Sequence, residues 1–189
     1  RLRTERVDAR IASLEKEAGT LLARAEAAVS ESGDPAALFR NPLGKEALGK
    51  GIILLAYKDG RAVYWSDNSI AFPVIYEQGF KDHKPVFYSN GWFVPMHREF
   101  PGYQLLALIK IYRQYPIVNN ILRSGFPENF PLPEQTRITF EAGASDYQIM
   151  GSEKEFHFGL LFPDRKPNTI FIIFPVLLWL VVLFLLIRL

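Results

Sequence analysis

The first 33 residues place apolar side chains at alternating steps of four and three, with charged residues between them. This spacing predicts one long amphipathic helix over residues 1–33, ended by Gly33 and Pro35. A heptad pattern of this kind suits either pairing with a second copy of the chain or packing on the domain's own sheet, and the sequence leaves both open. The apolar positions are Val7, Ile11, Leu14, Ala18, Leu21, Ala25 and Ala28.

Residues 34–163 carry short apolar runs separated by turn signals, a pattern typical of antiparallel strands. Asp-Gly at Gly60 and Asn-Gly at Gly91 each stand between two such runs and predict tight hairpins, and a third hairpin is expected around Gly143. The predicted strands are 51–57, 62–65, 86–88, 92–94, 103–112, 137–140, 147–150 and 156–162.

The longest of these runs, 103–112, is apolar enough to predict a central strand buried on both faces. Pro116 and Gly125 suit the first turn and the end of a short helix over 116–126. A mostly antiparallel sheet preceded by a long helix predicts a domain of the α+β class.

Every residue from 170 to 187 is apolar, in the order IFIIFPVLLWLVVLFLLI. A helix of this length spans about 27 Å, enough to cross the bilayer core, and no polar stripe marks a solvent-facing side. The sequence therefore predicts a C-terminal transmembrane helix, joined to the sheet by a linker over 164–169. The lipid bilayer is an expected partner.

Composition excludes several classes of function. Because 22 basic and 20 acidic residues leave a formal charge of +2, no nucleic-acid partner is expected. The absence of cysteine excludes disulfides and thiolate zinc sites. No nucleophile or phosphate-loop motif occurs, so no catalytic residue and no cofactor is predicted.

The three histidines, His83, His97 and His157, lie in separate segments without the paired spacing of a metal site. No metal site is therefore predicted. His157 stands between Phe156 and Phe158 in a predicted strand, so its side chain should point to the opposite face from theirs. A structural or surface role is favoured for it.

One cluster of polar and aromatic residues, near Asn90 and Glu99, has the composition of a small-molecule pocket, which combines aromatic walls with a few polar groups. Arg98 offers a planar fork for a carboxylate or phosphate. The alternative is that the aromatic residues belong to the core and the charged ones to a solvated loop. The candidate ligand-binding residues are Tyr88, Trp92, His97, Arg98 and Tyr103.

A second candidate patch comprises Trp65, Asp67 and Asn68. Here the alternative, with the tryptophan in the core and the Asp-Asn pair capping a turn, is favoured over a binding site.

Two segments carry a resemblance to a known family. They are LLAYKDGRAVYWSDNSI (54–70) and LLALIKIYRQYPIVNNILRSGFPENFPLP (105–133). The order and spacing of their residues resemble those of the extracytoplasmic sensor region of bacterial membrane sensor histidine kinases. Hairpins of that region carry V-x-W-S-x-N, and its later segments carry G-F-x-x-x-F-x-L-P.

The resemblance implies a PAS-like or Cache-like sensor domain over residues 34–163, held between two membrane helices. It also implies the bacterial inner membrane, with residues 1–169 extracytoplasmic, a homodimer through the N-terminal helix, and a small-molecule ligand. The phospho-accepting histidine and the ATP site belong to a kinase core beyond Leu189, so no catalytic residue of the family falls within this chain.

The leading hypothesis is therefore the sensory input module of a two-component kinase. A ligand or membrane stress would favour one of two packings of the long helix on the sheet, and the last strand would pass the change to the transmembrane helix. The alternative is a membrane-anchored assembly or protein-interaction domain without a kinase. An anchored hydrolase, with His97 and Arg98 as its best candidates, ranks third.

Overall fold

The computed structural model describes most of the chain up to the end of the sheet. The predicted linker, the apolar run 170–187 except Trp179, and most of the predicted helix 116–126 lie outside the described residues. Within the part of the chain that is described, no helix has both the length and the apolar character needed to cross a membrane. The described residues are 2–116, 123–133, 135–145, 147–152, 154–163 and 179.

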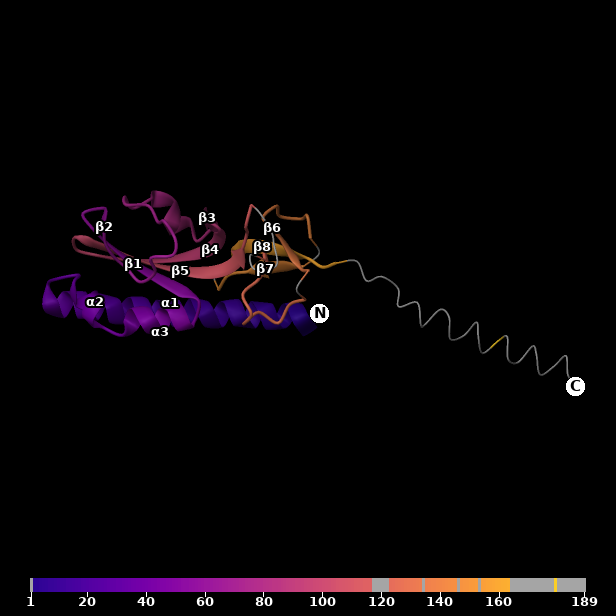
Figure 1. Ribbon diagram of the computed structural model, residues 1–189, viewed down its shortest axis with the longest axis horizontal. Helices are drawn as coiled ribbons and strands as arrows, with labels where there is room; N and C mark the ends of the chain where they lie inside the picture. The colour runs from indigo at the N-terminus through magenta and orange to yellow at the C-terminus, as the bar shows by residue number, and fades with distance from the viewer. Residues whose placement is uncertain are drawn as a thin grey trace, which may run out of the picture.

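The predicted N-terminal helix forms as one element, α1 (Leu2–Ser32), which runs along the length of the molecule beneath the strands (Figure 1). Its apolar seam faces the sheets: Val7, Ile11 and Ala18 are fully buried, and only Ala28 of the seven seam positions is partly exposed. The seam pattern therefore corresponds to packing on the chain's own domain. A contact with a second copy would have to use another face of α1.

The first sheet has five antiparallel strands in the order β2-β1-β5-β4-β3, which places β5 at its centre, as predicted. The two hairpins predicted at Gly60 and Gly91 join β1 to β2 and β3 to β4. The strands are β1 (Ile52–Lys58), β2 (Arg61–Trp65), β3 (Val86–Tyr88), β4 (Gly91–Phe100) and β5 (Tyr103–Arg113).

Three short helical segments flank these strands and were not predicted. They are α2 (Ala37–Arg40), α3 (Leu43–Gly49) and the 3-10 helix η1 (Gln78–Asp82). Strand β4 is also longer than the predicted 92–94 and continues through Pro95. Proline is tolerated there because β3 pairs only with the first three residues of β4, so no strand of the sheet pairs with that edge beyond Phe93.

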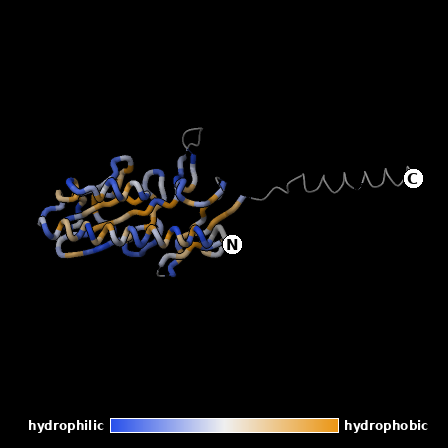
Figure 2. Tube along the Cα trace, turned by 90° about the horizontal axis from the view of Figure 1, so that it is seen from below, coloured by the Kyte–Doolittle hydropathy of each residue, from blue (hydrophilic) through white to orange (hydrophobic). Residues whose placement is uncertain are grey.

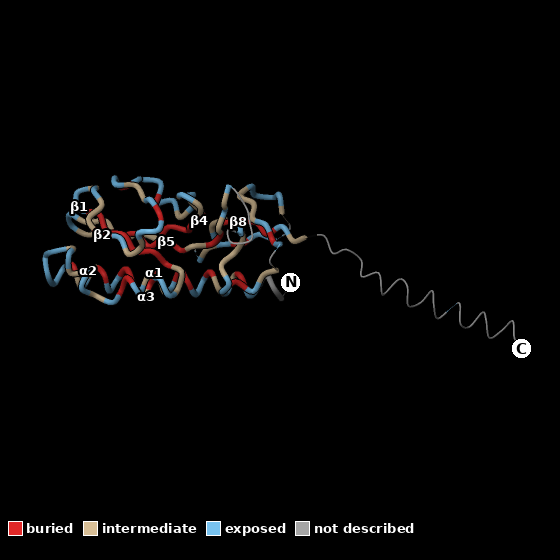
Figure 3. Tube along the Cα trace, viewed as in Figure 1, coloured by how far each residue is buried: buried red, intermediate tan, exposed pale blue. Residues whose placement is uncertain are grey.

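Each face of the first sheet has its own cover, and this explains why β5 is apolar on both sides. Leu105, Ala107 and Ile109 pack in the core between the first sheet and α1. Leu106 and Leu108 pack in a second core on the opposite face of the sheet. The segment between β2 and β3 closes that second core with Ile70, Tyr76 and Phe80. Figure 3 shows the buried stretches of the strands enclosed between α1 and this outer segment, and Figure 2, seen from below, shows hydrophobic stretches along the strands.

A second sheet of three strands lies beside the first half of α1 (Figure 1) and has the order β6-β8-β7. The predicted hairpin between 137–140 and 147–150 is wrong, because both strands pair with β8 and not with each other. The strands are β6 (Arg137–Thr139), β7 (Gln148–Met150) and β8 (Phe156–Leu161).

Burial explains the strand order of the second sheet. β8 is its most buried strand and takes the central place, which leaves the short, partly exposed β6 and β7 at the edges. The connection between them crosses β8 at Gly159. A Cβ there would lie 2.8 Å from Thr139 Cγ2 and 2.9 Å from Ser145 Cβ, so the crossing requires a glycine. The molecule is therefore α+β, with one helix covering two antiparallel sheets.

Candidate functional site

The five residues predicted to form a ligand pocket do not come together in the structure. Tyr88 packs against the core on the face of the first sheet away from α1, whereas Trp92 and Tyr103 pack against the core beneath α1. Trp92 pairs with Tyr112 at one end of the β4–β5 ladder and Tyr103 with Phe100 at the other end. The three aromatic candidates are therefore separated along the strands and by the two faces of the first sheet.

The two charged candidates also diverge, because neighbouring side chains of a strand point to opposite faces. Arg98 forms an ion pair with Glu26 of α1 through its Nε atom, so this side chain already has a carboxylate partner within the chain. His97 lies on the other face, with its ring 5.3 Å from that of His83. Burial, followed by the neighbouring His83, lowers the pKa of His97 below its ordinary value.

The aromatic candidates have partners within the chain as well. Tyr88 Oη donates a hydrogen bond to Glu77 Oε2 at 2.7 Å, and burial together with this carboxylate raises the pKa of Tyr88. Trp92 Nε1 donates to Gln114 Oε1 at 2.7 Å.

The second candidate patch, Trp65, Asp67 and Asn68, agrees in part with the alternative that these residues are structural. The Asp67 carboxylate accepts a hydrogen bond from the Ser69 backbone N–H at 2.8 Å and so caps a turn. Trp65 is not a core residue, because it is 44% exposed and lines an open hollow with Phe39 and Leu48.

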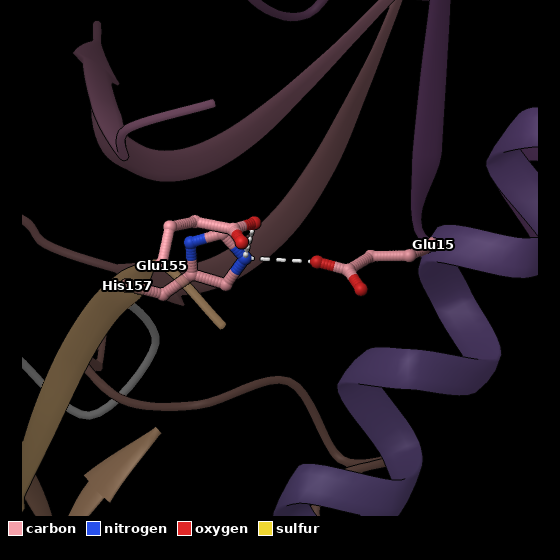
Figure 4. A group of neighbouring side chains, drawn as sticks. All are labelled: Glu15, Glu155 and His157. Carbon is pink, nitrogen blue, oxygen red and sulfur yellow. Dashed lines mark hydrogen bonds and ion pairs between the residues drawn. The ribbon is translucent and has the colours of Figure 1, made fainter. Parts of the chain in front are cut away.

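The most unusual constellation of the described residues joins α1 to the second sheet and comprises Glu15, Glu155 and His157 (Figure 4). Glu15 lies on the buried side of α1, between Ile11 and Ala18, and is only 4% exposed. His157 is 1% exposed and projects from β8. Buried ionisable side chains are uncommon unless they are paired, so the constellation is a candidate functional site.

Two carboxylates converge on one imidazole nitrogen in this cluster. His157 Nε2 lies 2.8 Å from Glu15 Oε1, a hydrogen-bond distance, and 3.6 Å from Glu155 Oε1. The second oxygen of Glu15 accepts a hydrogen bond of 3.0 Å from the backbone N–H of Ser152. Glu15 is therefore held from two sides by the second sheet.

A tight turn before β8 brings Glu155 into this arrangement. The Gly151 N–H donates to the Glu155 carbonyl at 2.8 Å, and the Lys154 N–H donates to the Gly151 carbonyl at 2.9 Å. A Cβ on Gly151 would lie 1.9 Å from Glu155 Oε1 and 2.6 Å from His157 Nε2. Only glycine leaves room for the carboxylate beside the imidazole.

The electrostatics of the cluster favour an ionised Glu15. Burial alone would raise its pKa, but the hydrogen bonds from His157 and Ser152 and the charge of His157 outweigh burial, so the pKa is lowered. Two of the buried polar atoms that lack a hydrogen-bond partner among the described residues belong to this cluster: His157 Nδ1 and Glu155 Oε2. The protein neighbours of the cluster thus leave one imidazole nitrogen and one carboxylate oxygen without a partner.

The sequence contained only one signal of this site, a histidine in an otherwise apolar strand. Glu15 and His157 are 142 positions apart, and a glutamate next to a heptad seam is ordinary in a helix. Comparisons with protein-family models, curated proteins and solved structures find no match to this chain. The geometry of the described residues therefore has to carry the functional argument.

Proposed function

We propose that this chain is the sensory input module of a membrane-bound signalling protein of the sensor-kinase type. The observation that carries the proposal is the Glu15–His157–Glu155 cluster, in which the buried Glu15–His157 pair links α1 to β8. The family resemblance and the apolar run 170–187 support the same function, and a long helix on one face of an antiparallel sheet agrees with the α+β sensor domain that the resemblance implies.

The position of the cluster suits a switch. The start of α1 and the end of β8 lie at the same end of the molecule (Figure 1), and the cluster joins α1 to β8, the last described strand before the predicted membrane helix. A buried charged contact is sensitive to anything that binds or removes charge, because the unpaired state is costly. A ligand that favours one state of the contact shifts α1 relative to β8 and thereby moves the predicted membrane helix.

A chimeric kinase tests this function. The chain is placed behind a signal-anchor segment and joined after Leu189 to the cytoplasmic core of a sensor kinase with a known transcriptional output. We expect Glu15→Gln and His157→Gln to shift the basal output several-fold. The matched control, Glu31→Gln, changes an exposed glutamate of the same helix and should leave the output unchanged. Equal output from all variants, with equal protein in the membrane, would contradict the proposal.

Topology is a separate requirement. Reporter fusions or protease accessibility should locate residues 60–150 on the extracytoplasmic side. If this segment is found in the cytoplasm, the extracytoplasmic input module is excluded even where the cluster behaves as expected.

A membrane-anchored interaction domain is the second candidate, and a specific surface favours it. Phe39 is 60% exposed, Trp65 44% and Leu48 39%, and they line one hollow together with Arg40 and Lys45. This hollow lies at the end of the molecule that carries α2 and β2, away from the start of α1 (Figure 1). Native electrophoresis of the solubilised protein should then show a larger complex that the double substitution Phe39→Ser and Trp65→Ser dissolves.

A further inference from the structure

We propose that Glu15, Glu155 and His157 form a binding site for a divalent transition-metal cation of the Zn²⁺ class. The proposal rests on the proposed function for its regulatory meaning, because the cation would be the signal that sets the contact between α1 and β8. Metal binding itself is a property of the isolated protein and is measured independently of signalling.

The ligand set is the first argument. Zn²⁺ accepts imidazole nitrogen together with carboxylate oxygen, and three protein ligands with a fourth position open to water are a known arrangement of its protein sites. One nitrogen and two carboxylate oxygens meet here, and their ligand atoms all lie within 4.8 Å of one another. Mg²⁺ and Ca²⁺ prefer six or more oxygen ligands, so a site with one nitrogen and two carboxylates selects against them.

The distances are the second argument. Two ligands at about 2.1 Å from a tetrahedral ion are about 3.4 Å apart. The separation of 3.6 Å between His157 Nε2 and Glu155 Oε1 is close to this value. The shorter separation of 2.8 Å to Glu15 Oε1 is that of a hydrogen bond, so the cation replaces the proton shared there and the flexible glutamate side chain moves outward by a fraction of an ångström.

The charge of the cluster is the third argument. One imidazole faces two carboxylates here, and among the described residues no lysine or arginine forms an ion pair with Glu15 or Glu155. Within the same described part of the chain, Glu155 Oε2 is buried and has no hydrogen-bond donor. A divalent cation compensates both carboxylates and can engage this oxygen, which removes a cost that buried, unpaired charge otherwise imposes.

A route to the site is also present. A surface hollow of about 380 Å³ reaches Gly151 and Ser152, the two residues that contact Glu155 and Glu15. Asp8 of α1 lines the same hollow, so the approach carries an acidic residue. Glu15 and His157 are buried and Glu155 is partly exposed, and the cluster lies close behind two of the residues that line this hollow.

The test is a titration of the full chain, purified in detergent and stripped of metal with a chelator. Calorimetry with Zn²⁺ should give one equivalent, whereas Mg²⁺ and Ca²⁺ should give no heat of binding. Co²⁺ should bind with the visible absorption bands of a low-coordinate nitrogen and oxygen site. His157→Gln and Glu155→Gln should each weaken Zn²⁺ binding at least about tenfold, and Glu31→Gln should not change it.

Glu155→Gln keeps the tests informative if changes at His157 or Glu15 prevent folding, because it leaves the hydrogen bond between those two residues in place. Absence of Zn²⁺ binding by the folded wild-type protein would overturn the site. Unchanged Zn²⁺ affinity in both His157→Gln and Glu155→Gln would also overturn it and would indicate binding elsewhere, for example at His83 and His97. Zn²⁺ binding without any change in the output of the chimeric kinase would leave the site standing and exclude the cation as the signal; equal output from all variants would refute the proposed function. A change of output in Glu15→Gln together with no Zn²⁺ binding by the wild type would overturn the site and leave the proposed function standing.

Discussion

At the scale of single residues, the polar contacts of this protein hold its layers together. Arg98 pairs with Glu26 between the first sheet and α1, and His157 pairs with Glu15 between the second sheet and α1. Only the second pair is buried, with side chains 0% and 5% exposed, so its loss should have the larger effect on stability.

Replacing Glu15 with alanine should lower the free energy of unfolding by about 3 kcal/mol, because it leaves the buried imidazole and the Ser152 N–H without their partner. Glu15→Gln retains an acceptor and should cost less. Urea unfolding in the presence of a chelator, followed by circular dichroism, measures both variants. If Glu15→Ala unfolds at the same urea concentration as Glu31→Ala, the pair has no structural role.

His97 should make the fold sensitive to mild acid. Burial and His83 lower its pKa in the folded state, and the other charged groups facing it are Glu99 and Lys81. Protonation is thus easier in the unfolded chain, so this contribution to stability is complete above about pH 6.5 and declines as the pH falls below it. The difference in stability between wild type and His97→Gln, measured from pH 8 to pH 5, should change in this direction. A difference that does not vary with pH would contradict it.

At the scale of elements, close approach rather than local propensity decides several features. β8 accepts a strand on each side, and the chain passes over it at Gly159, where a methyl group would meet Thr139 and Ser145. Gly19, in the middle of α1, has no atom within 4 Å of the position that a Cβ would take. These two glycines should therefore respond oppositely to the same substitution.

Gly159→Ala should lower the free energy of unfolding by about 1–3 kcal/mol through overpacking. Gly19→Ala should raise it by about 0.5–1 kcal/mol, because alanine restricts the unfolded chain and suits a helix interior. Thermal or urea unfolding of the Gly159→Ala and Gly19→Ala variants tests whether the connection from β6 to β7 crosses β8 at Gly159. An increase in stability for Gly159→Ala would mean that the second sheet does not have the strand order described above.

At the scale of the whole molecule, α1 connects the parts. One core contains residues of this helix, of the first sheet and of β7 and β8, among them Leu21, Ile109 and Phe158. Because the seam is buried within one chain, weakening it should destabilise the fold rather than dissociate a dimer. Any self-association of the protein, as the resemblance implies, would use other surfaces.

Leu21→Ala tests this arrangement. Leu21 is 1% exposed, so its truncation should lower the free energy of unfolding by about 2–5 kcal/mol. Sedimentation should give the same oligomeric state for the variant as for the wild type under conditions where both are folded. A variant of unchanged stability that sediments as a smaller species would show that the seam pairs two chains.

The sequence alone determined those features that depend on neighbouring residues. The spacing of Val7, Ile11 and Leu14 required a helix with one apolar side, and the glycines at 60 and 91 required two hairpins, because both signals arise within one or two turns of chain. The double-sided hydrophobicity of 103–112 likewise required a central strand. The predicted strands 137–140 and 147–150 looked like a hairpin for the same local reason.

Only the tertiary structure decided which of these elements met. Strand β8 separated the two strands that the local pattern joined, since it buries more apolar surface at the centre of its sheet than at an edge. The same packing brought Glu15 to His157 across 142 positions of chain. Charge and hydrogen bonding act through space, and no spacing within a single segment encodes a contact between a helix at the start of the sequence and a strand 142 positions later.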